Sequence, residues 1–134
     1  MVRLNSTQLS EAQLVQLFSQ FSRAVASLSG SEAGSFLCEL LGHEEHVMLA
    51  KRFATIVLLV EGVSKYRASR ILKISPSTAE KVHAKLEKGE YKQLLKTLGK
   101  DKKEYWDILN TLDSILHLGG ILPHYNGIDR RWRL

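Results

Sequence analysis

Residues 62–90 read GVSKYRASRILKISPSTAEKVHAKLEKGE and contain the clearest helix signals in the chain. Two serines in it precede runs with helical spacing, and serine is a favoured N-cap residue because its hydroxyl accepts a hydrogen bond from the first helical turn. Ser64 predicts a helix over about 65–72, and Ser75 predicts a second helix that begins with Pro76. The stretch therefore predicts two short helices joined by a tight turn.

The second of these helices has an apolar face and a polar face. Its spacing turns Ala79, Val82 and Leu86 inward, and Gly89 ends it. The side chains that project outward are polar or basic: Ser77, Thr78, Lys81 and Lys85. A tight turn followed by a helix with such an outer face predicts a helix-turn-helix at residues 64–88.

Helix signals continue on both sides of this motif. No segment alternates apolar and polar residues as a strand does. Ser10, with Gln13 three residues later, is a capping box, and the run from Phe53 to Val60 is apolar all round, which predicts the buried centre of the fold. Further helices are expected at about 11–28, 36–41, 44–61, 91–98 and 101–118. The expected fold class is therefore all-α, with several helices.

The first expected helix carries a narrow apolar seam. Its members recur at spacings of three and four residues: Leu14, Leu17, Phe21, Ala24 and Leu28. Such a seam suits a helix packed lengthwise on a partner helix, although an ordinary core-facing stripe has the same spacing. We expect residues 1–99 to form a helical dimerisation core that contains the helix-turn-helix. Residues 100–134 should add a C-terminal helix and tail packed on the same domain.

Positive charge is concentrated in one segment. The whole chain has a net charge of +5, whereas residues 62–100 alone carry +7, from ten basic side chains against three glutamates. The ten are Lys65, Arg67, Arg70, Lys73, Lys81, Lys85, Lys88, Lys92, Lys96 and Lys100. Such a segment is typical of a protein that binds a polyanion, although a solvated basic face without a partner would have the same composition.

Composition also bears on location. No basic stretch followed by an apolar run opens the chain, so we expect no signal peptide. The longest apolar run, Phe53 to Val60, is far shorter than the ~20 residues of a membrane span. Cys38 is the single cysteine, so no intrachain disulfide is expected. We therefore expect a cytoplasmic protein without a membrane partner.

Catalytic and metal-binding motifs are not recognisable in the sequence. We find no serine–histidine–acid grouping, P-loop, glycine-rich dinucleotide motif or metalloprotease motif, and therefore expect neither an enzyme nor a cofactor. Cys38, His43 and His46 match no common zinc spacing, so we expect no metal site.

The central half of the chain carries a family resemblance. An acidic helix start, a long apolar helix, a glycine and the helix-turn-helix follow one another in FLCELLGHEEHVMLAKRFATIVLLVEG and SKYRASRILKISPSTAEKV. In this order and spacing, residues of about 31–99 resemble the Trp repressor superfamily. The resemblance implies an intertwined all-helical homodimer whose helix-turn-helix units enter successive major grooves of double-stranded DNA. It also implies a sequence-specific transcriptional regulator, and a repressor, because the family acts in that way.

The resemblance extends to a ligand site, with two replacements. In tryptophan-binding members of the family, two arginines grip the ligand and a glycine leaves room for the indole. These positions fall at Arg52, Lys81 and Val82. A lysine lacks the planar surface on which an indole stacks, and a valine would occupy the space of the indole. The resemblance thus implies Arg52 and Lys81 as candidate effector-binding residues, whereas tryptophan is not the expected effector.

We assign two kinds of DNA contact to the helix-turn-helix. The first turns of a recognition helix enter the major groove, so the candidates for base contacts are Ser77, Thr78 and Lys81, joined by Tyr66 from the preceding helix. Phosphate contacts supply affinity without reading the sequence. The candidates for those contacts are Lys65, Arg67, Lys73, Ser75 and Lys85.

A function of another class remains open. The chain could be a protein-interaction or assembly module built on a helix-turn-helix core, without specific DNA reading. The C-terminal helix and tail extend past the resemblance and could cover a partner. The basic-aromatic end of the tail could equally be an arm that reaches DNA, or a frayed terminus. That end comprises Arg130, Arg131, Trp132 and Arg133.

Overall fold

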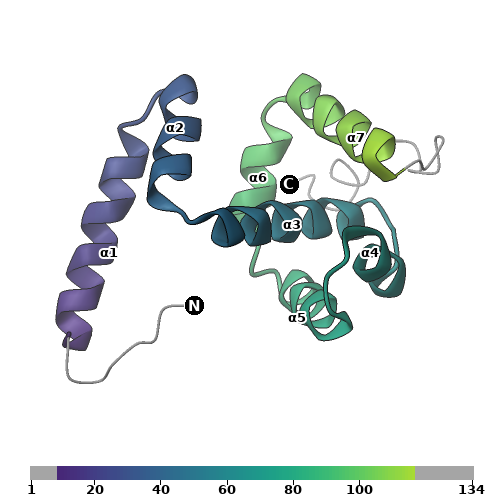
Figure 1. Ribbon diagram of the computed structural model, residues 1–134, viewed down its shortest axis with the longest axis horizontal. Helices are drawn as coiled ribbons and strands as arrows, with labels where there is room; N and C mark the ends of the chain where they lie inside the picture. The colour runs from purple at the N-terminus through teal and green to yellow at the C-terminus, as the bar shows by residue number, and fades with distance from the viewer. Residues whose placement is uncertain (1–8, 117–134) are drawn as a thin grey trace. The chain divides into compact units, whose positions relative to one another are not determined.

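The computed structural model describes residues 9–116, and over this range the chain is all-helical, without a strand (Figure 1). Its helices are α1 (Glu11–Ala26), α2 (Gly30–Leu40), α3 (His43–Val60), α4 (Lys65–Leu72), α5 (Pro76–Glu87), α6 (Lys92–Gly99) and α7 (Lys102–Leu116). The predicted all-α class is confirmed. No helix in this range is both long and apolar enough to cross a membrane. The basic-aromatic tail end, residues 130–133, lies outside the described residues.

The chain divides into two compact units. The N-terminal unit, Met1–His46, contains α1 and α2, and the C-terminal unit, Val47–Leu134, contains α4 to α7. The boundary falls inside α3, which contributes its first turn to the N-terminal unit and the rest to the C-terminal unit.

Both helices of the N-terminal unit begin with the same kind of cap. Ser10 Oγ accepts the backbone N–H of Gln13 at 3.2 Å, and Gln13 Oε1 accepts the backbone N–H of Ser10 at 2.9 Å, so the predicted capping box is confirmed. Ser29 and Glu32 form a second capping box, which begins α2 at Gly30 rather than at the expected residue 36. The prediction was wrong here because the residues that interrupt one helix also cap the next.

The N-terminal unit buries no side chain of α1 or α2. The rings of Phe21 and Phe36 stack with centroids 6.1 Å apart, which joins the two helices. The apolar side chains around them are nevertheless exposed: Phe18, for example, is 69% exposed and Leu17 is 51% exposed. The four predicted seam residues within α1 (Leu14, Leu17, Phe21 and Ala24) are exposed, whereas Leu28 follows the helix and is half-buried.

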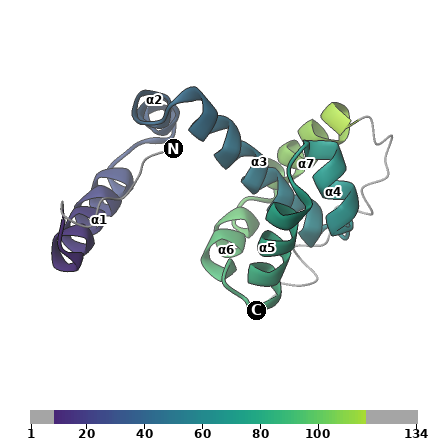
Figure 2. The same cartoon turned by 60° about the horizontal axis from the view of Figure 1, so that its bottom comes forward.

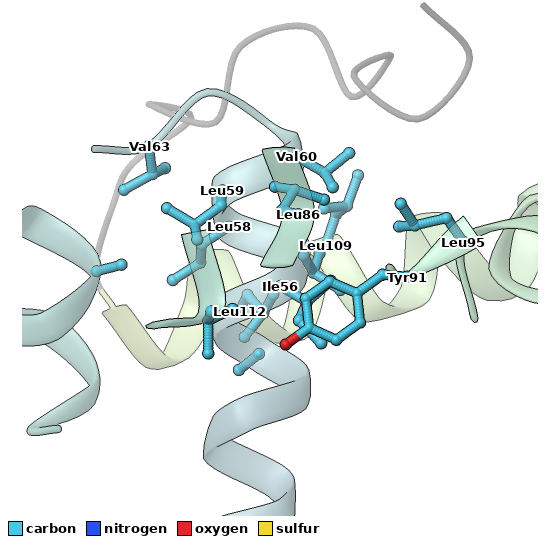
Figure 3. Close-up of a cluster of buried hydrophobic side chains, with 14 of the residues drawn as sticks. Ile56, Leu58, Leu59, Val60, Val63, Leu86, Tyr91, Leu95, Leu109 and Leu112 are labelled. Atoms are coloured by element: carbon cyan, nitrogen blue, oxygen red, sulfur yellow. The ribbon is translucent and has the colours of Figure 1, made fainter. Parts of the chain in front are cut away.

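The core of the C-terminal unit surrounds the second half of α3. Every residue from Ala54 to Val60 is buried, which confirms the predicted centre. Figure 3 shows Leu86 from α5, Leu95 from α6 and Leu109 from α7 gathered around this segment, together with Tyr91 from the turn before α6. With Ala68 from α4, five helices contribute to one hydrophobic cluster.

A buried hydrogen bond ties α7 to the end of α3. Tyr105 Oη donates to Glu61 Oε2 at 2.6 Å, and both residues are buried. The chain leaves α3 at this point through Gly62, whose φ of 97° favours glycine. α6 and α7 also pack against each other. The described part of the C-terminal segment therefore belongs to the same unit as α4 and α5.

The two helices and the tight turn predicted for residues 64–88 are present, and α4 and α5 pack against each other (Figure 2). Ser64 and Ser75 are their N-caps, with side-chain oxygens that accept backbone N–H groups of the first turns. Lys73 turns the chain in the left-handed conformation, at φ 55°. The N–H of Ile74 then donates to the carbonyl of Ser69 at 3.1 Å, which closes the turn. We refer to these helices as the α4–α5 pair.

Candidate nucleic-acid interface

Three hydroxyl side chains gather at the N-terminus of α5. Ser75 Oγ caps the helix through the N–H of Thr78 at 3.1 Å, and it also lies 2.8 Å from Thr78 Oγ1 and 3.3 Å from Ser77 Oγ. Ser77 is exposed, whereas Thr78 is half-buried. Of the two hydroxyls predicted to read bases, that of Ser77 is therefore the more accessible, because the hydroxyl of Thr78 is engaged close to the helix.

Tyr66 projects from the first turn of α4. It is 65% exposed, and its hydroxyl accepts a hydrogen bond from Arg70 Nη1 at 3.1 Å. The guanidinium also lies 5.7 Å from the centroid of the Tyr66 ring, within the range of a cation–π contact. Arg70 was not among the predicted site residues, although its position four residues after Tyr66 on the same helix could have indicated the contact.

Lys65 is engaged with an acid from the neighbouring helix. Its Nζ lies 3.2 Å from Glu80 Oε1, which links α4 to α5. Both side chains are substantially exposed, so the ion pair contributes only ~0–1 kcal/mol to stability. A phosphate could therefore compete for Lys65, but the predicted contact would have to displace or share Glu80.

The turn of the α4–α5 pair carries a further cation. Lys73 and Arg67, both predicted to meet phosphates, are exposed. The backbone carbonyl of Lys73 accepts a hydrogen bond from Lys51 Nζ at 3.4 Å, so a lysine of α3 lies beside the turn. This role of Lys51 was not predictable from the sequence, because the contact spans 22 residues and depends on how α3 packs.

A pocket of about 710 Å³ opens between α3, α5 and the start of α6. It brings Arg52 and Lys81, the two predicted effector-binding residues, to one cavity. Its lining combines three cations with apolar side chains: Met48, Leu49, Arg52, Phe53, Ile56, Thr78, Lys81, Val82, Lys85, Tyr91 and Leu94. Such a lining suits a ligand with an apolar body and a negatively charged group.

The third cation of the pocket is Lys85, a phosphate contact in the sequence-based prediction. Its Nζ lies 5.2 Å from the centroid of the Tyr91 ring, a cation–π distance. Burial raises the pKa of the Tyr91 hydroxyl, and the positive charge of Arg52 opposes this shift in part. Tyr91 therefore remains a neutral hydrogen-bonding group in the pocket wall at physiological pH. Tyr91 had no predicted role at a site, because its apolar neighbours assigned it to a helix face.

Cys38 and His46 lie close together in the N-terminal unit. Cys38 Sγ is 3.9 Å from His46 Nδ1, and both residues are exposed. His43 is not part of this contact. Within residues 9–116 we find no cluster of three or more histidine, cysteine, aspartate or glutamate side chains able to hold a metal ion.

Comparisons with protein-family models, with curated proteins and with solved structures find no match to this chain. The residues of the chain itself, and above all the motif in residues 62–90, are what indicate its function.

Proposed function

We propose that this protein is a sequence-specific DNA-binding transcriptional regulator, a repressor, in which the α4–α5 pair acts as a helix-turn-helix. The observation that supports this proposal most is the outer surface of α5. Ser77 and Lys81 are exposed and lie four residues apart, on one face of the helix. The opposite face is held in the core by Val82 and Leu86. A polar face on a helix whose apolar face is fixed suits insertion into a major groove.

The contacts with DNA divide by chemistry. Ser77, Lys81 and Tyr66 are the base-reading candidates with exposed side chains, and Thr78 would position the N-terminus of α5 through its contact with Ser75. Arg67 would meet phosphate without first breaking an ion pair. The other proposed phosphate contacts are those of Lys65, Lys73, Ser75 and Lys85.

We also propose that the protein acts as a homodimer through the N-terminal unit. α1 and α2 bury no side chain, and their apolar residues include Val15, Leu17 and Phe18 at exposures above one half. Helices of this length are marginal in water without a packed apolar face. A second copy would supply a matching apolar face, because a two-fold interface pairs the same patch from each subunit.

The pocket supports a regulatory ligand as part of the same proposal. Arg52 and Lys81 would bind a carboxylate or another anionic group, and Phe53 with Leu94 would contact an apolar body. Val82 occupies the position at which tryptophan-binding relatives would need a glycine, so tryptophan is not the proposed effector. Because Lys81 would serve both the pocket and the DNA, an anionic ligand would change the reading surface directly.

Salt-dependent binding to duplex DNA tests the proposed function. Wild-type protein should bind random duplex DNA with an affinity that falls as salt rises, and selection from a random pool should recover a preferred site. Ser77→Ala should cost ~1–3 kcal/mol on that site and much less on random DNA, because an uncharged contact carries no counterion release. Fluorescence anisotropy measures the affinity for the selected site and the affinity for random DNA.

Lys103→Ala is the matched control for charge loss at Lys81, since Lys103 is an exposed lysine on α7. Lys81→Ala should lower the preference for the selected site, and Lys103→Ala should leave it unchanged. Wild-type protein that binds no duplex DNA at low salt would instead support the assembly module, in which the α4–α5 pair only packs.

A further inference from the structure

A row of positive charge on α6 has no part in the contacts described so far. Lys92 and Lys96 of α6 and Lys100, the C-cap residue of that helix, follow one another at intervals of four residues, and we call them the α6 lysine row. All three are exposed, and within residues 9–116 none of them forms an ion pair. Like charges at this spacing on a helix repel each other. The row is thus unfavourable for α6 in isolation, and a polyanion would relieve the repulsion.

The row lies on a helix whose other face is fixed. Leu95 is buried, and Leu94 and Leu98 pack against the same hydrophobic cluster. On a helical projection Leu94 and Leu98 lie opposite the lysines, and Leu95 lies at the side of the row. The cations are therefore presented on a supported surface, and the apolar face of α6 is not available to enter a membrane.

The residues between the lysines favour nucleic acid over protein as the partner. Gln93 and Thr97 flank the row and are exposed, with Thr97 Oγ1 donating to the carbonyl of Gln93 at 3.0 Å. No large apolar side chain of α6 is exposed. Protein interfaces are enriched in aromatic residues, methionine and arginine and depleted of lysine. Lysine, glutamine and threonine are instead common partners of the DNA backbone.

The length of the α6 lysine row corresponds to a few successive phosphates of the DNA backbone. Lys92 and Lys100 are eight residues apart, which corresponds to roughly 12 Å along a helix. One strand of duplex DNA presents a phosphate about every 3.4 Å along the axis, so the row spans roughly three or four phosphates.

We propose that the α6 lysine row is a second surface for the phosphate backbone of duplex DNA, separate from the segment read by α5. The backbone could belong to the flank of the same duplex or to a neighbouring duplex. The inference rests on the proposed function, since it takes for granted that the α4–α5 pair binds DNA.

A double variant tests the row against a control of equal charge. K92Q/K96Q removes two cations of the row, and K102Q/K103Q removes two from the start of α7. Anisotropy titrations over a range of salt would use random-sequence duplexes of about 12 base pairs, little more than one helical turn, and of about 40 base pairs. Circular dichroism checks that both variants keep the helical content of the wild type.

For flanking DNA, K92Q/K96Q should lower the salt slope on the long duplex by roughly two units, one for each lost phosphate contact, and leave the short duplex unaffected. For a neighbouring duplex, the wild type should bring two differently labelled short duplexes together, as seen by energy transfer, and the variant should lose this signal. K102Q/K103Q should match the wild type in both arms.

Three outcomes would overturn the inference. If the wild type binds DNA and K92Q/K96Q behaves like it in both arms, the α6 lysine row does not contact DNA, and the proposed function is unaffected. Binding of polyglutamate that K92Q/K96Q alone abolishes, with DNA binding unaltered, assigns the row to an acidic protein. Absence of wild-type DNA binding removes both proposals together.

Discussion

The helices of the α1–α2 pair and of the α4–α5 pair begin with the same kind of N-cap, but the two pairs differ in how many of their residues are buried. All four helices have a serine N-cap, at Ser10, Ser29, Ser64 and Ser75. The α4–α5 pair nevertheless buries residues on both helices, whereas the α1–α2 pair buries none, although α1 is the longest of the four helices. Capping and burial are therefore independent properties. Local sequence decides where a helix begins, and only a packing partner decides whether its apolar face is covered.

The largest effect, on self-association, is expected from charges placed on the exposed apolar residues of the α1–α2 pair. L17E/F21E should abolish self-association, because two carboxylates per chain would enter the proposed dimer interface. The core around Ala54–Val60 should survive, since no residue of α1 belongs to it. Light scattering should give twice the 15.1 kDa chain mass for the wild type and the chain mass for the variant.

Hydrogen exchange provides the second readout of this variant. Amides of α1 and α2 should lose protection in L17E/F21E, and those of the second half of α3 should keep it. A wild-type protein that is already monomeric at micromolar concentration would contradict the proposed dimer. The exposure of the apolar residues of α1 and α2 would then have no explanation.

A smaller effect, on stability, is expected from the buried hydrogen bond between Tyr105 and Glu61 in the C-terminal unit. Tyr105→Phe removes the donor to Glu61 Oε2 and leaves a buried carboxylate with one hydrogen bond fewer. The free energy of unfolding should fall by about 1–3 kcal/mol, as measured by urea denaturation. Tyr66→Phe is the matched control: its hydroxyl is exposed, so water replaces the lost contact and stability should hardly change.

The smallest effect, on the pKa of one side chain, is expected at the capping box of α2. The backbone N–H of Ser29, and next its hydroxyl, hold the pKa of Glu32 below its ordinary value of 4.5. A lowered pKa in the folded state means that Glu32 stabilises α2 above its unfolded pKa and loses this contribution as the pH falls through the folded pKa. Ser29→Ala should raise the pKa of Glu32 towards 4.5, which a carbon-13 titration of the side-chain carboxyl would detect. The shift should be partial, because the substitution keeps the backbone N–H of residue 29, and an unchanged titration would mean that the Ser29 hydroxyl does not contact Glu32 in solution.

The features that were predictable from the sequence are local ones. Ser10 with Gln13, Ser75 with Pro76, and the apolar run of α3 each specify their helix through neighbours a few residues away. The turn at Lys73 was predictable for the same reason. Even the misplaced start of α2 has a local cause, since the Ser29–Glu32 box is visible in the sequence.

The features that were not predictable join distant parts of the chain. Tyr105 and Glu61 are 44 residues apart, and Lys65 meets Glu80 across two helices. The pocket combines Arg52 of α3 with Lys81 of α5, and the family resemblance alone suggested that they belong together. Spacing along one helix carries no information on such pairs, because they depend on how the helices pack.

The left-handed lysine at the turn has a consequence for engineering. A residue with a Cβ at φ 55° carries a backbone strain of roughly 1–2 kcal/mol, which glycine at the same position would not have. Lys73→Gly would therefore make the chain more stable, and it would also remove a positive charge from the proposed DNA surface. Stability and binding would then have opposite optima at this one position. A search for thermostable variants of this protein would tend to select against its proposed activity.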